Sequence, residues 1–243
     1  MQSTSVQTYA RAAGILFLLS MIGGFFGELY IPSRIIVSGD AAATAKNIIE
    51  SSSLFRLGFA AYLVEGMCDI ALSLILYVLL KPVHRNLALL AAFFGLVSTA
   101  VFAVGELFYF GASLPLGGAD YLKSFSPDQL NALSLLSLRM YGLVAGIFMA
   151  FYGMATGLRG YLIYRSEYLP RALGILMMLA GLGFIARNFV LVLAPAYASN
   201  IFLIPMFLSG VFLTLWMLVK GVDVVKWEAR AAAVMARAPS PQP

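Results

Sequence analysis

Six long apolar stretches constrain the fold of this chain more than any other feature of its sequence. A helix that crosses the hydrocarbon core of a bilayer needs about 20 mostly apolar residues. The stretches that meet this length lie at residues 10–30, 54–80, 87–111, 131–157, 172–194 and 200–220. The sequence therefore predicts an all-α, polytopic integral membrane bundle of six transmembrane helices.

The composition agrees with this prediction. Hydrophobic residues make up 61% of the chain and charged residues 11%, whereas ordinary soluble domains carry about 25% charged residues. The N-terminal apolar run lacks a small-residue cleavage site and is long enough to span, so we interpret it as a first helix rather than a signal peptide. We attribute the net charge of +5 to basic loops on one side of a bilayer and expect no nucleic-acid partner.

Lysines and arginines are divided unevenly between the two sets of connections. One set carries Arg11, Lys81, Arg85, Arg159, Arg165, Arg171, Lys220, Lys226, Arg230 and Arg237. The other set carries Arg34, Lys46 and Lys123. Because cytoplasmic loops are enriched in basic residues, the more basic set is predicted to be cytoplasmic, together with both termini. We expect a transmembrane domain over residues 1–228 and a flexible cytoplasmic tail over residues 229–243, which is rich in Ala and then in Pro.

Both outer connections contain signals for short helices. Residues 39–53 are predicted to form a short helix with Asp40, a typical N-cap residue, at its start, and Ser126-Pro127-Asp128 marks a second helix start. These segments predict short outer loop helices, which are either solvated elements or a lid over the outer side.

Ionisable side chains interrupt the apolar spans. An ionised side chain at the centre of a membrane helix costs about 2.5–3.5 kcal/mol, so such groups are expected to face protein or water. Helical spacing places Tyr62, Glu65 and Asp69 on one stripe of the second span. The candidate ligand- or ion-binding residues are Glu28, Arg56, Tyr62, Glu65, Asp69, Glu106, Arg139, Arg187 and Asn188.

Two interpretations of these residues remain open. In the first, Glu65 and Asp69 form the floor of a polar pocket that opens outward, with Arg139 and Arg187 above them. In the second, pairs of arginines and carboxylates only fix the packing of the helices. A further hypothesis is that Asp69, the deepest acid, is protonated at neutral pH.

The usual catalytic and cofactor motifs do not occur. The chain has one histidine, His84, and one cysteine, Cys68, so ordinary zinc and haem sites are not expected and no cofactor is predicted. Hard cations held by carboxylates remain open. No enzyme motif is found, and the question of catalysis stays open.

We therefore weigh three functions. The first is a transporter-like or sensor-like protein that binds a small polar molecule or ion. The second is a non-catalytic accessory subunit of a larger membrane complex. The third is an intramembrane enzyme that uses carboxylates on a lipid or quinone. The expected partners are the lipid bilayer, a polar or ionic ligand, and a membrane-protein partner or a second copy of the chain.

Three blocks of the sequence resemble a known family. These are GLRGYLIYRSEYLPRALGILMMLAGLGF from Gly157, GDAAATAKNIIESSSLFRLGF from Gly39, and LILYVLLKPVHRNLALLAAFFGLV from Leu74. They are similar to a bacterial membrane family catalogued as domain of unknown function 4386. The resemblance implies six helices and a location in the bacterial plasma (inner) membrane. It implies no activity, and it gives no functional residue that could be assigned to a position of this chain.

Overall fold

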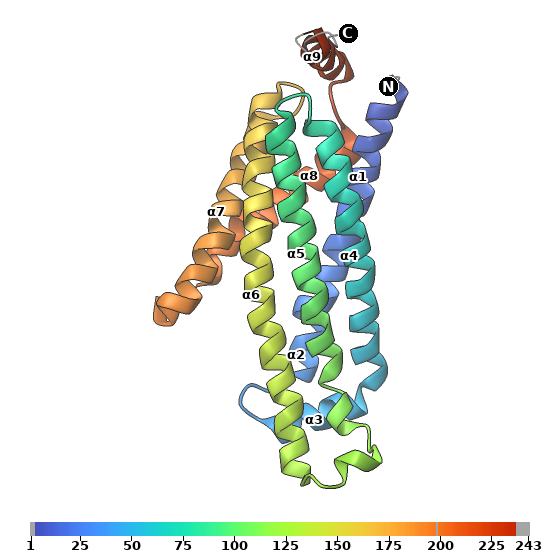
Figure 1. Ribbon diagram of the computed structural model, residues 1–243, viewed down its shortest axis with the longest axis vertical. Coiled ribbons are helices and arrows are strands. Elements are labelled where there is room, and N and C mark those ends of the chain that lie inside the picture. Colours follow the sequence, from blue (N-terminus) through green and yellow to red (C-terminus); the bar gives the residue numbers. More distant parts are fainter. Residues whose placement is uncertain (1–2, 198, 237–243) are drawn as a thin grey trace, which may run out of the picture. The chain divides into compact units, whose positions relative to one another are not determined.

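The computed structural model describes residues 3–197 and 199–236, and every regular element within them is a helix (Figure 1). The α-helices are α1 (Ser3–Gly24), α2 (Ile31–Ile35), α3 (Ala41–Glu50), α4 (Ser52–Leu80), α5 (Arg85–Gly111), α6 (Pro127–Ser166), α7 (Arg171–Leu193), α8 (Ile204–Val219) and α9 (Val224–Ala236). A π-helix, η1, covers Phe25–Tyr30, and the 3-10 turns are η2 (Leu114–Leu116), η3 (Asp120–Leu122), η4 (Pro195–Tyr197) and η5 (Asn200–Leu203).

Six of these helical stretches are long and apolar enough to cross a membrane, as the sequence predicts. They extend over Val6–Ile35, Ser52–Leu80, Arg85–Leu116, Pro127–Ser166, Arg171–Leu193 and Ile201–Val219. The fourth differs most from the predicted span of 131–157, because α6 continues for 40 residues to Ser166. Of the predicted tail over 229–243, residues 229–236 belong to α9, and the remainder lies outside the described residues.

The predicted helix starts are confirmed by their hydrogen bonds. The backbone N–H of Ala43 donates to Asp40 Oδ1 at 2.9 Å, which caps α3. At the start of α6, the N–H of Gln129 donates to Ser126 Oγ at 3.3 Å, and the N–H of Ser126 donates to Gln129 Oε1 at 2.8 Å. This reciprocal pair is a capping box, which satisfies two backbone donors that the helix leaves without partners.

The first span contains the π-helix η1 where the sequence predicts an ordinary helix. Pro32 lies four residues after Glu28, and a proline inside a helix has no N–H to donate and clashes with the carbonyl four residues before it. In η1 the N–H of Ile31 donates to the Phe26 carbonyl, five residues back. The wider turn accommodates Pro32, and it sets the direction of the Glu28 side chain.

The chain divides into two compact units, which are described separately. The first unit comprises Met1–Leu18, Asp69–Val97 and Met149–Pro243, and the second comprises Leu19–Cys68 and Ser98–Phe148. The core of the first unit is aliphatic, with buried side chains such as Leu79, Leu162 and Met217. The core of the second unit is rich in aromatic residues, including Phe55, Tyr62, Phe102, Tyr109 and Tyr141.

Candidate functional site

Three glutamates and three tyrosines gather in the second unit, and we name them the acid–tyrosine cluster. Its members are Glu28, Tyr62, Glu65, Glu106, Tyr109 and Tyr141, which come from η1, α4, α5 and α6. The sequence predicted four of them as site residues. It missed Tyr109 and Tyr141.

Close packing between the first span and α4 positions one side of this cluster. A Cβ atom on Gly27 would lie 2.6 Å from Tyr62 Cζ, so only glycine permits the approach. A Cβ atom on Gly24 would lie 3.3 Å from Oε1 of Glu65. Small residues at membrane helix contacts allow such close approach, and here they bring two side chains of α4 against η1 and the end of α1.

The hydroxyl of Tyr141 connects two members of the cluster. It lies 2.8 Å from Glu28 Oε1 and 2.7 Å from the Tyr62 hydroxyl oxygen. Because a phenol carries one proton, Tyr141 donates to only one of these groups at a time. When it donates to Glu28, the Tyr62 hydroxyl is the donor to Tyr141. When Glu28 itself carries a proton, the direction of both bonds can reverse.

Glu106 is the most enclosed acid of the acid–tyrosine cluster. The residue is 4% exposed, and neither of its carboxyl oxygens has a hydrogen-bond partner among the described residues. Glu28 and Glu65 are close enough to interact with it electrostatically. Three acids therefore act on one another in an interior that supplies Glu106 with no hydrogen bond and no ion pair from the described chain.

Aromatic rings enclose the cluster. The ring of Tyr62 packs edge-on against Phe102 at 5.4 Å and against Tyr109 at 5.5 Å. Tyr109 also stacks on Phe55 at 4.4 Å, and its hydroxyl donates to the Phe55 carbonyl at 3.1 Å. The Tyr109 hydroxyl is thus bound to the backbone and not to an acid of the cluster.

Two arginines of this unit that were predicted as site residues do not belong to the acid–tyrosine cluster. Arg56 and Arg139 are exposed, and neither makes an ion pair with a described residue. On α6, Leu138 and Tyr141 are buried. At 100° per residue, Arg139 is rotated by about 160° from Tyr141, which turns it away from the cluster. A ligand-binding role for Arg56 and Arg139 stays a prediction.

A second polar group lies in the first unit around Arg159. This arginine is 5% exposed, and its Nη2 atom donates to Ser73 Oγ at 3.0 Å. Asp69 and Tyr152 interact with it electrostatically. A Cβ atom on Gly95 would lie 2.5 Å from Nη2 of Arg159, so the guanidinium packs directly on the α5 backbone.

The prediction that Arg159 lies in a cytoplasmic connection is wrong. It lies inside α6, which extends nine residues beyond the predicted end at 157. The pattern that indicates this is helical. Ala155, Arg159 and Leu162 share one face, and all three are buried. Glu65 and Asp69 both lie on α4, four residues apart, where the chain passes from the second unit to the first. A shared ligand-binding role for the two acids stays a prediction.

The last two predicted site residues belong to the first unit. Arg187 is half-buried, and its Nη1 atom contacts the sulfur of Met149 at 3.7 Å. Asn188 is buried, and its Nδ2 donates to the Phe184 carbonyl at 2.8 Å, while its Oδ1 has no partner among the described residues. Within the described chain, no three His, Cys, Asp or Glu side chains are arranged to hold a metal ion.

These helices define the class: the chain is a multi-pass membrane protein with six apolar spans. Comparison with known sequences gives the family. The chain belongs to the family described as a domain of unknown function (DUF4386), whose model matches residues 12–221. The resemblance seen in the sequence is thereby confirmed.

One relative comes from Archaeoglobus fulgidus and is described as an uncharacterized protein. It is 27% identical over 158 residues, which are 63% of this chain and 76% of the relative. No solved structure gives a significant match to the chain.

Proposed function

We propose that the acid–tyrosine cluster binds and releases a proton within the membrane, and that the protein uses this step in solute transport or in sensing. The observation that carries the proposal is Glu106, a buried carboxyl group without a hydrogen bond or an ion pair among the described residues. Ionisable groups within membrane spans are rare, and substrate or ion pathways and proton relays are among the roles that they mark.

A proton is the occupant that this cluster favours on energetic grounds. Each ionised carboxylate at the centre of a membrane helix costs about 2.5–3.5 kcal/mol, and neighbouring carboxylates repel each other as well. Glu106 forms no ion pair with a lysine, arginine or histidine of the described residues. Uptake of a proton removes one of the like charges and needs no cavity. The arrangement favours a proton or a cation over an anionic solute.

The bonds of Tyr141 support a route for the proton. The chain of oxygens from Glu28 through Tyr141 to Tyr62 allows a proton to pass between Glu28 and Tyr62 by reversing two hydrogen bonds. Glu106 is not hydrogen-bonded to this chain and is coupled to it electrostatically, through Glu28. Asp69 fits this role less well than Glu106, because Arg159 supplies Asp69 with a nearby positive charge. We therefore assign the titrating proton to the cluster rather than to Asp69.

Infrared spectroscopy of the reconstituted protein tests the assignment. A difference spectrum between acidic and alkaline pH should show a protonated-carboxyl band from a buried environment, and this band should disappear in Glu106→Gln. Glu50→Gln is the matched control, because Glu50 is an exposed acid that pairs with Lys46 at 3.8 Å on α3. The control should keep the band unchanged. A band that persists at full intensity in Glu106→Gln would refute the proposal.

An accessory subunit of a larger membrane complex is the second candidate, and the first unit supports it. There Arg159 binds Ser73 and packs on Gly95, an arrangement that fixes helices without leaving the guanidinium to a solute. Co-purification of a stable partner from native membranes, together with an infrared spectrum that lacks a titrating carboxyl band, would favour this function over the first.

We further propose that both termini face the cytoplasm and that the protein lies in a plasma membrane. The excess of lysine and arginine in one set of connections supports the orientation. Arg159 no longer counts toward that excess, because it is buried within α6. The remaining basic residues of that set still outnumber the three on the other side.

A further inference from the structure

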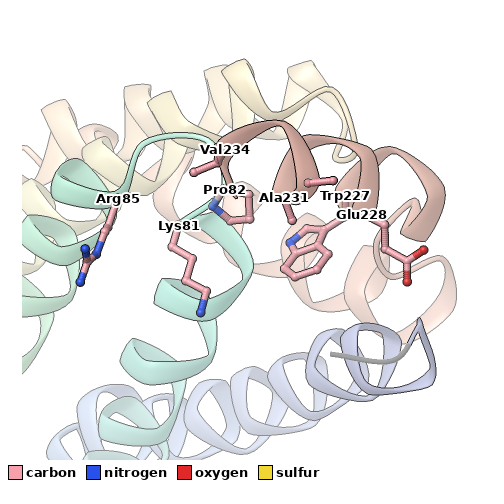
Figure 2. Close-up of a pocket in the computed structure, with 8 residues that line it drawn as sticks. Lys81, Pro82, Arg85, Trp227, Glu228, Ala231 and Val234 are labelled. Atoms are coloured by element: carbon pink, nitrogen blue, oxygen red, sulfur yellow. The ribbon is translucent and has the colours of Figure 1, made fainter. Parts of the chain in front are cut away.

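A cavity of about 500 Å³ lies in the first unit, where the connection between α4 and α5 meets α9. Figure 2 shows Lys81, Pro82 and Arg85 on the side of the connection and Trp227, Ala231 and Val234 on the side of α9. The remaining lining residues are Glu228 and Ala232. A volume of this size is in the range of small-molecule sites.

The wall formed by α9 is tied to the end of α4 by one hydrogen bond, from Trp227, and the same carbonyl also accepts a bond from Tyr168, in the connection between α6 and α7. The carbonyls in the last turn of a helix have no partner within the helix. Here the Leu79 carbonyl accepts from Trp227 Nε1 at 2.9 Å and from the Tyr168 hydroxyl at 2.7 Å. Burial raises the pKa of Tyr168, so its hydroxyl remains a donor at physiological pH. The hydrogen bond of Trp227 therefore holds the α9 wall of the cavity against the end of α4.

The cavity has two chemically different ends. Lys81 and Arg85 provide two positive charges, and neither makes an ion pair with a described residue. The rest of the wall is mostly apolar, with the buried Trp227 indole and side chains of α9. Glu228 lies at the end opposite Arg85, so its negative charge is separated from this cationic end (Figure 2).

The position in the fold indicates the membrane surface. The second span ends at Leu80 and the third begins at Arg85, so Lys81 and Arg85 lie where two membrane helices leave the hydrocarbon. Anionic head groups occupy this depth, with acyl chains directly beneath them. Basic pockets at the ends of membrane helices are suited to anionic lipids.

We propose that this cavity binds one anionic phospholipid. Its phosphate lies between Lys81 and Arg85, and the upper part of an acyl chain packs against Trp227, Ala231 and Val234. The cationic end explains the preference for an anionic head group, and the apolar wall explains why the ligand is a lipid rather than a free phosphate ester. The inference does not depend on the proton-binding role of the acid–tyrosine cluster.

Native mass spectrometry of the purified full-length protein, titrated with phosphatidylglycerol or with phosphatidylcholine, tests this proposal. We expect phosphatidylglycerol to bind at least about tenfold more tightly to the wild type. The double variant Lys81→Gln/Arg85→Gln should lose that preference. The matched control, Arg165→Gln/Arg171→Gln, removes two exposed arginines near the next connection on the same side of the membrane and should keep it.

Soluble glycerol phosphate provides the second arm of the test, and it should not displace the lipid at comparable concentration. Ala231→Asp places a charge in the apolar wall and should weaken both lipids. The proposal is overturned if the wild type binds both lipids equally, if Lys81→Gln/Arg85→Gln retains its preference, or if glycerol phosphate competes as well as the intact lipid.

Discussion

The buried polar side chains of this protein fall into two groups with different chemistry. Around Glu106, two further glutamates act electrostatically on a buried carboxyl group that has no hydrogen-bond partner of its own among the described residues. The guanidinium of Arg159 donates a hydrogen bond to the Ser73 hydroxyl and interacts electrostatically with the nearby carboxylate of Asp69. The first arrangement is costly unless a proton or cation neutralises it. The second is largely self-compensated and stabilises the packing.

The close approach of Arg159 to α5 predicts a stability defect in Gly95→Ala. The added Cβ would lie 2.5 Å from Arg159 Nη2 and 2.6 Å from Ser73 Oγ, which forces both groups apart. We expect a loss of about 1–3 kcal/mol, the usual cost of overpacking. It can be measured as a lower thermal unfolding midpoint in detergent.

Gly142→Ala is the control for this substitution, since no atom lies within 4 Å of a Cβ at that position. It should leave the midpoint unchanged or raise it slightly. Equal midpoints for both variants would show that the Arg159 contact does not contribute to stability.

Sequence reasoning located most of the buried acids but misjudged their partners. The apolar surroundings of Glu65 and Glu106 show at once that these groups must face protein or water. The positions of the arginines were harder to predict, because a basic residue near the end of a predicted span is usually assigned to a loop. Arg159 was missed for this reason, and the exposed Arg139 was taken for a partner of the acids. Tyr141 was missed because tyrosines are common in membrane helices without any polar role.

At the scale of elements, η1 is the feature that sequence patterns did not predict. An apolar run with a proline near its end is compatible with a kink, an ended helix or a π-helix, and only the packing of the surrounding helices selects one. Most of the other membrane helices were predictable to within a few residues at their ends, but α6 runs nine residues past its predicted end and α9 was not predicted as a helix. Asp40 and Ser126 both lie at helix starts, as expected.

If Pro32 causes the wide turn, Pro32→Ala should restore ordinary α-helical bonding. The new N–H at position 32 could then donate to the Glu28 carbonyl, four residues before it. We expect slower hydrogen–deuterium exchange across Phe25–Tyr30 in this variant than in the wild type. The rewound turn would also redirect Glu28 and weaken its bond to Tyr141.

Pro205→Ala is the control for this experiment. Pro205 lies in the first turn of α8, where an N–H has no helical partner to restore. Exchange in α8 should change little. Unchanged exchange across η1 in Pro32→Ala would mean that the tertiary packing, and not the proline, holds the π-helix.

For the whole molecule, the described residues contain six candidate spans, an even number. We therefore expect the start of the first span and the end of the last to lie on the same side of the membrane. The side itself rests on the distribution of basic residues. We expect α9 to be cytoplasmic and η3, in the connection before α6, to be on the opposite side.

Cysteine labelling in a Cys68→Ser background checks this orientation. Val225→Cys on α9 and Tyr121→Cys on η3 alter side chains that are 77% and 71% exposed. In intact cells, a membrane-impermeant maleimide should label Tyr121→Cys and leave Val225→Cys unlabelled. After the membrane is broken, both should react. The reverse pattern in intact cells would invert the predicted topology.

The length of α6 has a consequence for what can reach this protein from water. Its 40 residues extend for about 60 Å, roughly twice the thickness of the hydrocarbon core of a bilayer. Tilting alone cannot keep a helix of that length within the hydrocarbon core, so at least one of its ends must project into water. The projecting part of α6 is a rigid helical surface that antibodies, proteases or a docking protein can reach from water, without entering the lipid.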